Sequence, residues 1–263
     1  MKGTKVMPPH RRRRMIGIQI LIVILLVLAV GTAIYIGNYY HADESAAAMV
    51  QRPSAGVEVE TARGDWITFR EAKATGTGAE DDASTGLIFY PGGKVQAESY
   101  APLMQMLAKE GVVCVLVKMP GNLAVLDKDA AEDVMAAYPD IKDWYIGGHS
   151  LGGVMAADFA GDRPEAFQGV FLLGAYTTED LSGSKLKGLT LTGSKDGVLN
   201  REKYEENREN LPSGTEEVTI PGGNHAGFGS YGPQAGDGES TISPEAQQER
   251  TAEAVADWIR EQE

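Results

Sequence analysis

The sequence has little cysteine and little histidine, and it has no acidic residue before Asp43. With one cysteine, Cys114, the chain of 263 residues can form neither an internal disulfide nor a cysteine-rich zinc site. Its four histidines leave few candidates for a general base. The formal net charge of −13 repels nucleic-acid phosphates, which excludes DNA or RNA binding as a function class.

A basic head is followed directly by a long uncharged run. Residues 1–14 hold Lys2, Lys5 and four arginines, and residues 15–40 carry no charge and have an almost purely aliphatic centre. About 20 apolar residues in a helix cross the hydrocarbon core of a bilayer, so the run predicts one transmembrane helix over 15–40. Positive charge before it and acids after it predict a single-pass protein of the cell membrane, with a cytoplasmic N-terminus and an extracellular remainder.

A cleaved secretory signal is the alternative interpretation of this run. Residues 45–48 are small and offer a peptidase site, although the apolar region of such signals is usually about 7 to 15 residues long. The longer run here favours an uncleaved signal-anchor. Both interpretations export the rest of the chain, and the adjacent arginines argue against a buried core helix.

The exported part is expected to consist of a tether and one domain. Residues 41–56 are rich in alanine, serine and charged residues, which predicts a linker. Over residues 57–263, short apolar runs alternate with amphipathic stretches, beginning with a pair of strands at 57–60 and 66–69 and an acidic, exposed loop at 71–85.

The apolar runs of this domain are continuous, as in strands that are buried on both faces. This pattern predicts an α/β fold, with a mostly parallel, doubly wound sheet and an antiparallel pair at its edge. Cys114 falls in one such run and is interpreted as a small buried hydrophobe. We expect the further strands at residues 86–90, 112–118, 143–147, 169–173, 189–192 and 217–220, and helices at 96–110, 129–138, 150–160, 201–210 and 244–261.

The spacing Gly-x-Ser-x-Gly around Ser150 lies between a predicted strand and a predicted helix. A serine on such a sharp turn has strained backbone angles, and Gly148 and Gly152 relieve crowding around it. The turn exposes the serine oxygen at the carboxyl edge of the sheet, beside a helix N-terminus that favours developing negative charge. Ser150 is therefore the candidate nucleophile, and a structural or phosphate-binding glycine turn is the alternative.

A serine nucleophile needs a base within hydrogen-bond reach. His10 precedes the apolar run, His41 lies in the predicted tether, and His149 is expected to point away from the serine on the strained turn. His225, on the loop after the last predicted strand, is the remaining candidate base.

The third member of such a site is a buried carboxylate that orients the imidazole. Asp196 lies just past a strand end, and the order Ser150, Asp196, His225 is nucleophile, acid, base. Asp180 is the reserve candidate, in a segment that has the character of an exposed loop.

Acyl transfer also needs donors for an oxyanion. One is expected to be the backbone N–H of Leu151, the residue after the nucleophile, and the other to come from the glycine-containing loop after the 86–90 strand. Gly93 is the preferred candidate donor in that loop. Lys94 is the alternative, because the sequence does not specify which amide points inward.

Residues 86–263 resemble the α/β-hydrolase superfamily, in a compact, lidless bacterial branch related to dienelactone hydrolases. The segments that carry the resemblance are Tyr90-Pro-Gly-Gly-Lys94, Gly148-His-Ser-Leu-Gly-Gly153 and Gly223-Asn-His-Ala-Gly227. The resemblance implies an eight-stranded sheet, a Ser–His–Asp triad and no cofactor. The chain differs from many relatives in Pro91, where they carry His-Gly, and from dienelactone hydrolases in its serine nucleophile.

Together these features lead us to expect a membrane-anchored serine hydrolase that cleaves carboxylic esters through an acyl-enzyme. Amide or thioester cleavage would use the same residues, and a non-catalytic extracellular binding protein is the rival class. The segment of residues 174–188 is too short for a lid, which favours small or surface-presented acyl substrates. Asp237, in a glycine-rich stretch with too few regular oxygen ligands for a calcium loop, is interpreted as part of a solvated turn, and no metal is expected.

Overall fold

The computed structural model describes residues 9–62, 65–72 and 85–262. It separates the chain into two compact units, Met1–Asn38 and Tyr39–Glu263. Most of the acidic loop expected at 71–85, and two residues of the turn expected between the first two strands, lie outside the described residues.

The first unit contains one long helix, α1 (Pro9–Gly37). Its stretch Met15–Tyr35 is long and apolar enough to span a membrane or to act as a signal sequence, and none of it is buried within the protein. At 1.5 Å per residue, these 21 residues extend for about 30 Å, the thickness of a bilayer core. The helix ends at Gly37, so the expected span over 15–40 is helical only up to that residue.

The second unit is built on one sheet of eight strands in the order β1-β2-β4-β3-β5-β6-β7-β8. β2 pairs antiparallel with both β1 and β4, and every other pair is parallel, as the continuous apolar runs predict. The α/β fold with a mostly parallel sheet is therefore confirmed. The strands are β1 (Val57–Ala62), β2 (Trp66–Glu71), β3 (Thr85–Tyr90), β4 (Val113–Val117), β5 (Asp143–His149), β6 (Gly169–Leu173), β7 (Lys187–Gly193) and β8 (Glu216–Ile220).

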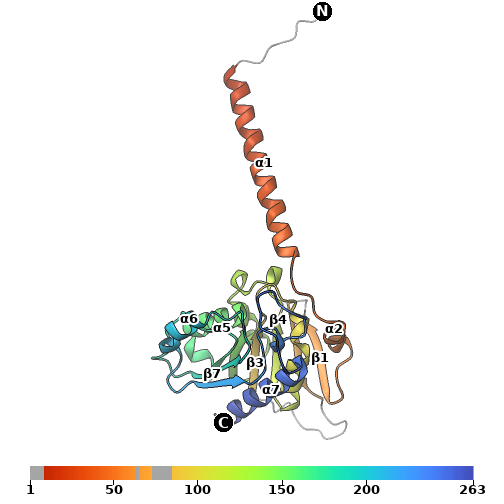
Figure 1. Ribbon diagram of the computed structural model, residues 1–263, viewed down its shortest axis with the longest axis vertical. Coiled ribbons are helices and arrows are strands. Elements are labelled where there is room, and N and C mark those ends of the chain that lie inside the picture. Colours follow the sequence, from red (N-terminus) through yellow and green to blue (C-terminus); the bar gives the residue numbers. More distant parts are fainter. Residues whose placement is uncertain (1–8, 63–64, 73–84, 263) are drawn as a thin grey trace, which may run out of the picture. The chain divides into compact units, whose positions relative to one another are not determined.

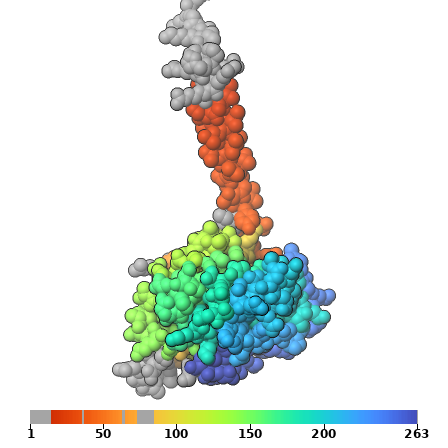
Figure 2. All heavy atoms as spheres, turned by 90° about the vertical axis from the view of Figure 1, so that its left-hand side faces the viewer, coloured from red at the N-terminus to blue at the C-terminus, as the bar shows by residue number. Residues whose placement is uncertain are grey.

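Helices cover both faces of the sheet (Figure 1). One apolar cluster joins the sheet to α3 and α7, and a second joins its other face to α4 and α5. Figure 2 shows the side of the domain that carries α5 and α6. The helices of this unit are α2 (Glu44–Gln51), α3 (Ala101–Lys109), α4 (Ala130–Ala137), α5 (Leu151–Asp162), α6 (Arg201–Glu206) and α7 (Pro244–Arg260), with short 3-10 turns η1 (Ala97–Tyr100), η2 (Pro120–Asn122), η3 (Ala124–Leu126), η4 (Pro164–Ala166), η5 (Arg208–Asn210) and η6 (Ala226–Phe228).

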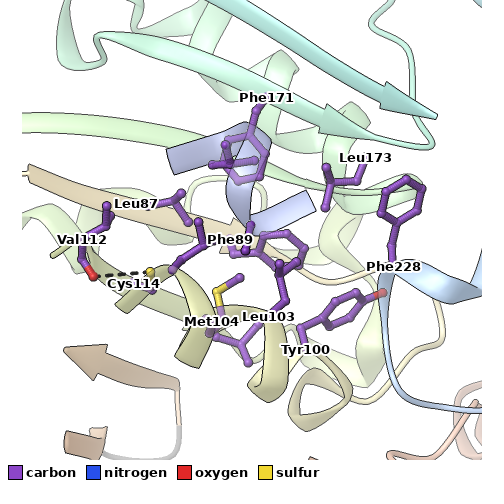
Figure 3. Packing of buried hydrophobic residues seen from close by; sticks show 14 of the residues in the cluster. Leu87, Phe89, Tyr100, Leu103, Met104, Val112, Cys114, Phe171, Leu173 and Phe228 are labelled. Atoms are coloured by element: carbon purple, nitrogen blue, oxygen red, sulfur yellow. Dashed lines mark hydrogen bonds between the residues drawn. The ribbon is translucent and has the colours of Figure 1, made fainter. Parts of the chain in front are cut away.

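The apolar cluster on the α3 and α7 side extends to Leu173, at the end of β6. Figure 3 shows Tyr100, Leu173 and Phe228 gathered at one end of this cluster. Cys114 lies farther inside, fully buried, and its thiol donates to the carbonyl oxygen of Val112 at 3.5 Å. Burial raises the pKa of the Cys114 thiol, which keeps it protonated and unreactive, as the interpretation as a small hydrophobe requires.

Residues 41–56 differ from the expected tether, because they fold onto the domain. They include helix α2, whose Ala46 is fully buried and which packs against α3 and η1. The composition suggested a linker, but alanine is also the strongest helix former, and its small side chain allows close packing.

Tyr40, just before this segment, also bonds to the domain, in the loop that follows β3. Its N–H donates to the carbonyl oxygen of Lys94, and its carbonyl oxygen accepts the N–H of Gln96. The Tyr40 ring lies 5.5 Å from that of Tyr231. Tyr40 therefore belongs to the folded domain.

Candidate active site

Ser150 occupies the turn between β5 and α5. Its backbone has φ +53° and ψ −124°, a strained conformation for a residue with a side chain. Its N–H donates to the carbonyl oxygen of Leu173 at 2.9 Å, which ties the turn to the end of β6. The side chain does not cap the helix, so the hydroxyl remains available beside the positive end of α5.

The glycines of the Gly-x-Ser-x-Gly motif are required by close backbone packing. A Cβ at either Gly148 or Gly152 would overlap the carbonyl oxygen of Tyr90, at the end of β3. At Gly152 it would also overlap the carbonyl oxygen of Pro91. The motif therefore lets the serine turn lie directly against the loop that follows β3.

Asp196 and His225 form a buried pair. His225 Nδ1 lies 2.9 Å from Asp196 Oδ2, and the two side chains are 1% and 0% exposed. The other carboxylate oxygen accepts the N–H groups of Val198 and Leu199 at 2.9 and 2.8 Å. Because the carboxylate is an acceptor, His225 Nδ1 carries the proton in this bond, which leaves Nε2 as the nitrogen that can accept a proton from a nucleophile.

The pKa of Asp196 reflects opposing effects. Burial raises the pKa of the carboxyl, but the hydrogen bond and charge of His225 and the N–H groups of Leu199 and Val198 outweigh it and hold the pKa below its ordinary value of 3.8. Asp196 is therefore ionised at neutral pH. The reserve candidate, Asp180, instead accepts from Ser182 in an exposed turn.

Ser150 and the Asp196–His225 pair both lie beside the end of β6. Ser150 is bonded to Leu173, and a Cβ on the next residue, Gly174, would lie 3.0 Å from His225 Nδ1 and 3.1 Å from Asp196 Oδ2. Gly174 has φ +53°, which favours glycine. His225 Nε2 is buried without a hydrogen-bond partner in the described part of the chain, so no hydrogen bond joins it to the Ser150 hydroxyl in this structure.

The two candidate oxyanion donors, Gly93 and Leu151, also lie side by side. A Cβ at Gly93 would lie 2.9 Å from Leu151 Cδ2. Lys94 N–H already donates to Asn122 at 2.7 Å, and Gly92 N–H donates to the Tyr100 hydroxyl at 3.1 Å. Among the described residues, the Gly93 N–H has no such partner, which favours it over Lys94 as a donor.

His149 and Tyr100 are site residues that the sequence analysis missed. His149 was set aside as a candidate base, and its fully buried ring lies 4.4 Å from the ring of His225. Its Nδ1 is 2.8 Å from the Tyr100 hydroxyl. The Tyr100 hydroxyl accepts from Gly92, and among the described residues His149 Nδ1 is the one acceptor that it contacts, so we assign the hydroxyl proton to this bond and the histidine proton to Nε2. Tyr100 follows the apolar pattern of a core residue, so the sequence contains no signal for this contact.

His149 remains neutral in the folded protein. Burial, followed by the neighbouring His225, lowers the pKa of His149 well below its ordinary value of 6.5. The unfolded chain therefore binds a proton that the folded chain does not, and stability falls as the pH drops below about 6.5.

Because the unfolded chain binds a proton at His149 that the folded chain does not, we expect His149→Gln to flatten the pH dependence of stability. One such proton changes the free energy of unfolding by about 1.4 kcal/mol per pH unit. Glutamine can still accept from Tyr100 but does not titrate. The free energy of unfolding is measured by urea unfolding between about pH 6.5 and 4.5. Its slope against pH should be lower in the variant than in the wild type, by up to the value for one proton. Equal slopes in the two proteins would contradict a neutral, buried His149.

Residues 237–239 do not form the solvated turn that the sequence predicted. The carboxylate of Asp237 is partly buried and accepts four backbone N–H groups, including that of His225. In the described part of the chain, no group of three or more His, Cys, Asp or Glu side chains is arranged to hold a metal ion.

Comparison with known proteins agrees with this architecture. The chain is similar in structure to Est1E from Butyrivibrio proteoclasticus, with a TM-score of 0.56 and 15% identity over 79% of this chain and 99% of that one. It is also similar to the dienelactone hydrolase of Anabaena variabilis, with a TM-score of 0.55 and 18% identity over 78% and 98%. At these identities the likeness concerns the fold. No curated protein matches the chain by sequence.

Residues 86–249 match the alpha/beta hydrolase family. This range is more than half of the chain, and it contains the serine turn, the Asp196–His225 pair and the loop of Gly93. The protein is therefore a member of the alpha/beta hydrolase family.

Proposed function

We propose that the protein is a serine hydrolase that cleaves carboxylic esters through an acyl-enzyme. The observation that carries this proposal is the buried hydrogen bond between Asp196 and His225, at the sheet edge where Ser150 is held in a strained turn. Gly93, Ser150 and Leu151 are partly exposed, whereas the side chains of the acid and the base are buried. The partly exposed groups can contact a substrate, and the buried acid and base can act on Ser150 from inside the protein.

The proposed reaction has two halves. The Ser150 oxygen attacks the ester carbonyl while its proton passes to His225 Nε2, and the N–H groups of Gly93 and Leu151 bind the oxyanion. His225 then gives the proton to the leaving alkoxide, which departs as an alcohol. Water attacks the acyl-serine while His225 accepts its proton, and His225 then gives this proton to the Ser150 oxygen as the carboxylic acid is released.

The loop between β6 and β7 supports a small or surface-presented acyl group. β6 ends at Leu173 and β7 begins at Lys187, and no helix is inserted between them. Without a lid, little protein is available to enclose a long acyl chain at this edge of the sheet. Amide and thioester substrates would be attacked by the same groups.

We also propose that the chain is an uncleaved signal-anchor with its hydrolase domain outside the cell. The basic residues before α1 support this orientation. Cleavage within residues 45–48 would split α2 and remove Tyr40, which pairs with Lys94 and Gln96 beside the loop of Gly93. Because these contacts belong to the folded domain, its integrity favours an intact N-terminal segment.

A membrane-impermeant fluorophosphonate probe, added to intact cells that make the full chain, tests both parts. We expect labelled, full-length protein in the membrane fraction, and faster turnover of short than of long p-nitrophenyl esters. A shortened, soluble, labelled protein would contradict the anchor, and labelling only after lysis would contradict the orientation. Absence of labelling even in the lysate would contradict the hydrolase and favour a binding protein.

A further inference from the structure

Asp237 lies where the turn that carries the acid meets the turn that carries the base. On the acid side, its Oδ1 accepts the N–H of Gly197, the residue after Asp196, at 3.0 Å. On the base side, the same oxygen accepts the N–H of His225 at 3.2 Å, and Oδ2 accepts the N–H of Ala226 at 2.8 Å. One carboxylate thus holds the backbones of both turns.

The same segment packs against the acid turn without room for side chains. A Cβ at Gly197 would lie 2.7 Å from the carbonyl oxygen of Gly236, and a Cβ at Gly238 would overlap the carbonyl oxygen of Lys195. The base turn is tied to this segment as well, because Asn224 donates to the carbonyl oxygen of Gly238 at 2.9 Å. The position of Asp237 is therefore determined from both sides.

We propose that Asp237 is a positioning residue for the Asp196–His225 pair. This inference rests on the proposed function and adds a residue that touches neither the substrate nor the reacting atoms. Hydrogen bonds from backbone N–H groups to a carboxylate are stronger than those to a neutral acceptor. By bonding to Gly197, the residue after the acid, and to the backbone of the base, the carboxylate sets the distance and angle at which His225 meets Asp196 and faces Ser150.

Asp237→Asn tests the proposal, with Asp180→Asn as a matched control. Asn keeps one acceptor oxygen but turns an NH₂ group toward an N–H that Asp237 now binds. Misplacement of a catalytic group by 1 Å can cost about 10²-fold in rate. We expect Asp237→Asn to lower kcat for p-nitrophenyl acetate by about that factor, with KM unchanged. Asp180 accepts hydrogen bonds from Ser182 in an exposed turn, so its variant should keep the wild-type kcat.

A double-mutant cycle separates positioning from general stability. If Asp237 acts through the Asp196–His225 pair, its loss should cost less than about 3-fold when Asp196→Asn is already present, because residues that act as a unit are not additive. A full loss in both backgrounds, or a rise in KM at constant kcat, would overturn the proposal. Rates are taken per mole of folded protein, from thermal unfolding of each variant.

Two further results complete the test. If Asp237→Asn does not fold, Asp237→Glu decides, because its longer side chain moves the carboxylate: a wild-type kcat would overturn the proposal, and a lowered kcat at unchanged KM would support it. A wild-type rate in Asp237→Asn, with Ser150→Ala and Asp196→Asn strongly impaired, would refute the positioning role alone. Full activity in Ser150→Ala would instead refute the proposed function.

Discussion

Replacement of Ser150 by alanine is expected to abolish labelling by a fluorophosphonate and to lower kcat for ester hydrolysis by about 10⁶-fold. The loss is large because the remaining groups can bind a substrate and polarise its carbonyl but cannot form the acyl-enzyme. The measurement is burst and steady-state kinetics with p-nitrophenyl acetate, together with in-gel detection of the probe.

The fold should survive this change. Alanine has a Cβ like serine, so it bears the same strain at φ +53°, and the serine side chain makes no capping bond that would be lost. The thermal midpoint of Ser150→Ala should therefore stay close to that of the wild type. Labelling of the variant at the wild-type rate would show that the reactive group lies elsewhere.

Replacement of Asp196 by asparagine is the second large effect. The amide can present an NH₂ group to His225 Nδ1, which then becomes an acceptor and leaves the proton on Nε2, where the base is needed. A tautomer error of this kind costs about 10⁴-fold in kcat in a serine protease, and we expect a loss of that order here. Steady-state kinetics with p-nitrophenyl acetate measure it.

Asp180→Asn is the control for this variant, because Asp180 was the other acid considered and lies in an exposed turn with Ser182. It should retain wild-type kinetics. If Asp180→Asn lost activity and Asp196→Asn did not, the assignment of the acid would have to be reversed.

The fold was predictable because it depends on local patterns. The central parallel strands are buried on both faces and appear in the sequence as continuous apolar runs, as in the fully buried β3 and β4, whereas the edge strand β8 is largely exposed. The helix boundaries were less certain: the predicted helix at 96–110 divides into η1 and α3. The tether at 41–56 was inferred from composition alone, and composition does not distinguish an alanine-rich linker from an alanine-rich helix with a face to bury.

The candidate site was predictable only in part. Ser150, Asp196 and His225 each follow a predicted strand, so their order and their shared edge could be inferred from the sequence. The choice between Gly93 and Lys94 depended on which N–H is already bonded, and Asn122, the acceptor for Lys94, lies in a distant turn.

The sequence by itself determined the apolar span of α1, the alternation that makes a parallel sheet, and the residues at the ends of its strands. These features depend on neighbours a few positions away, which periodicity detects. Only the tertiary structure placed Tyr100 against His149 and Asp237 against Gly197, because these partners are 49 and 40 residues apart. Such contacts form only after the strands assemble.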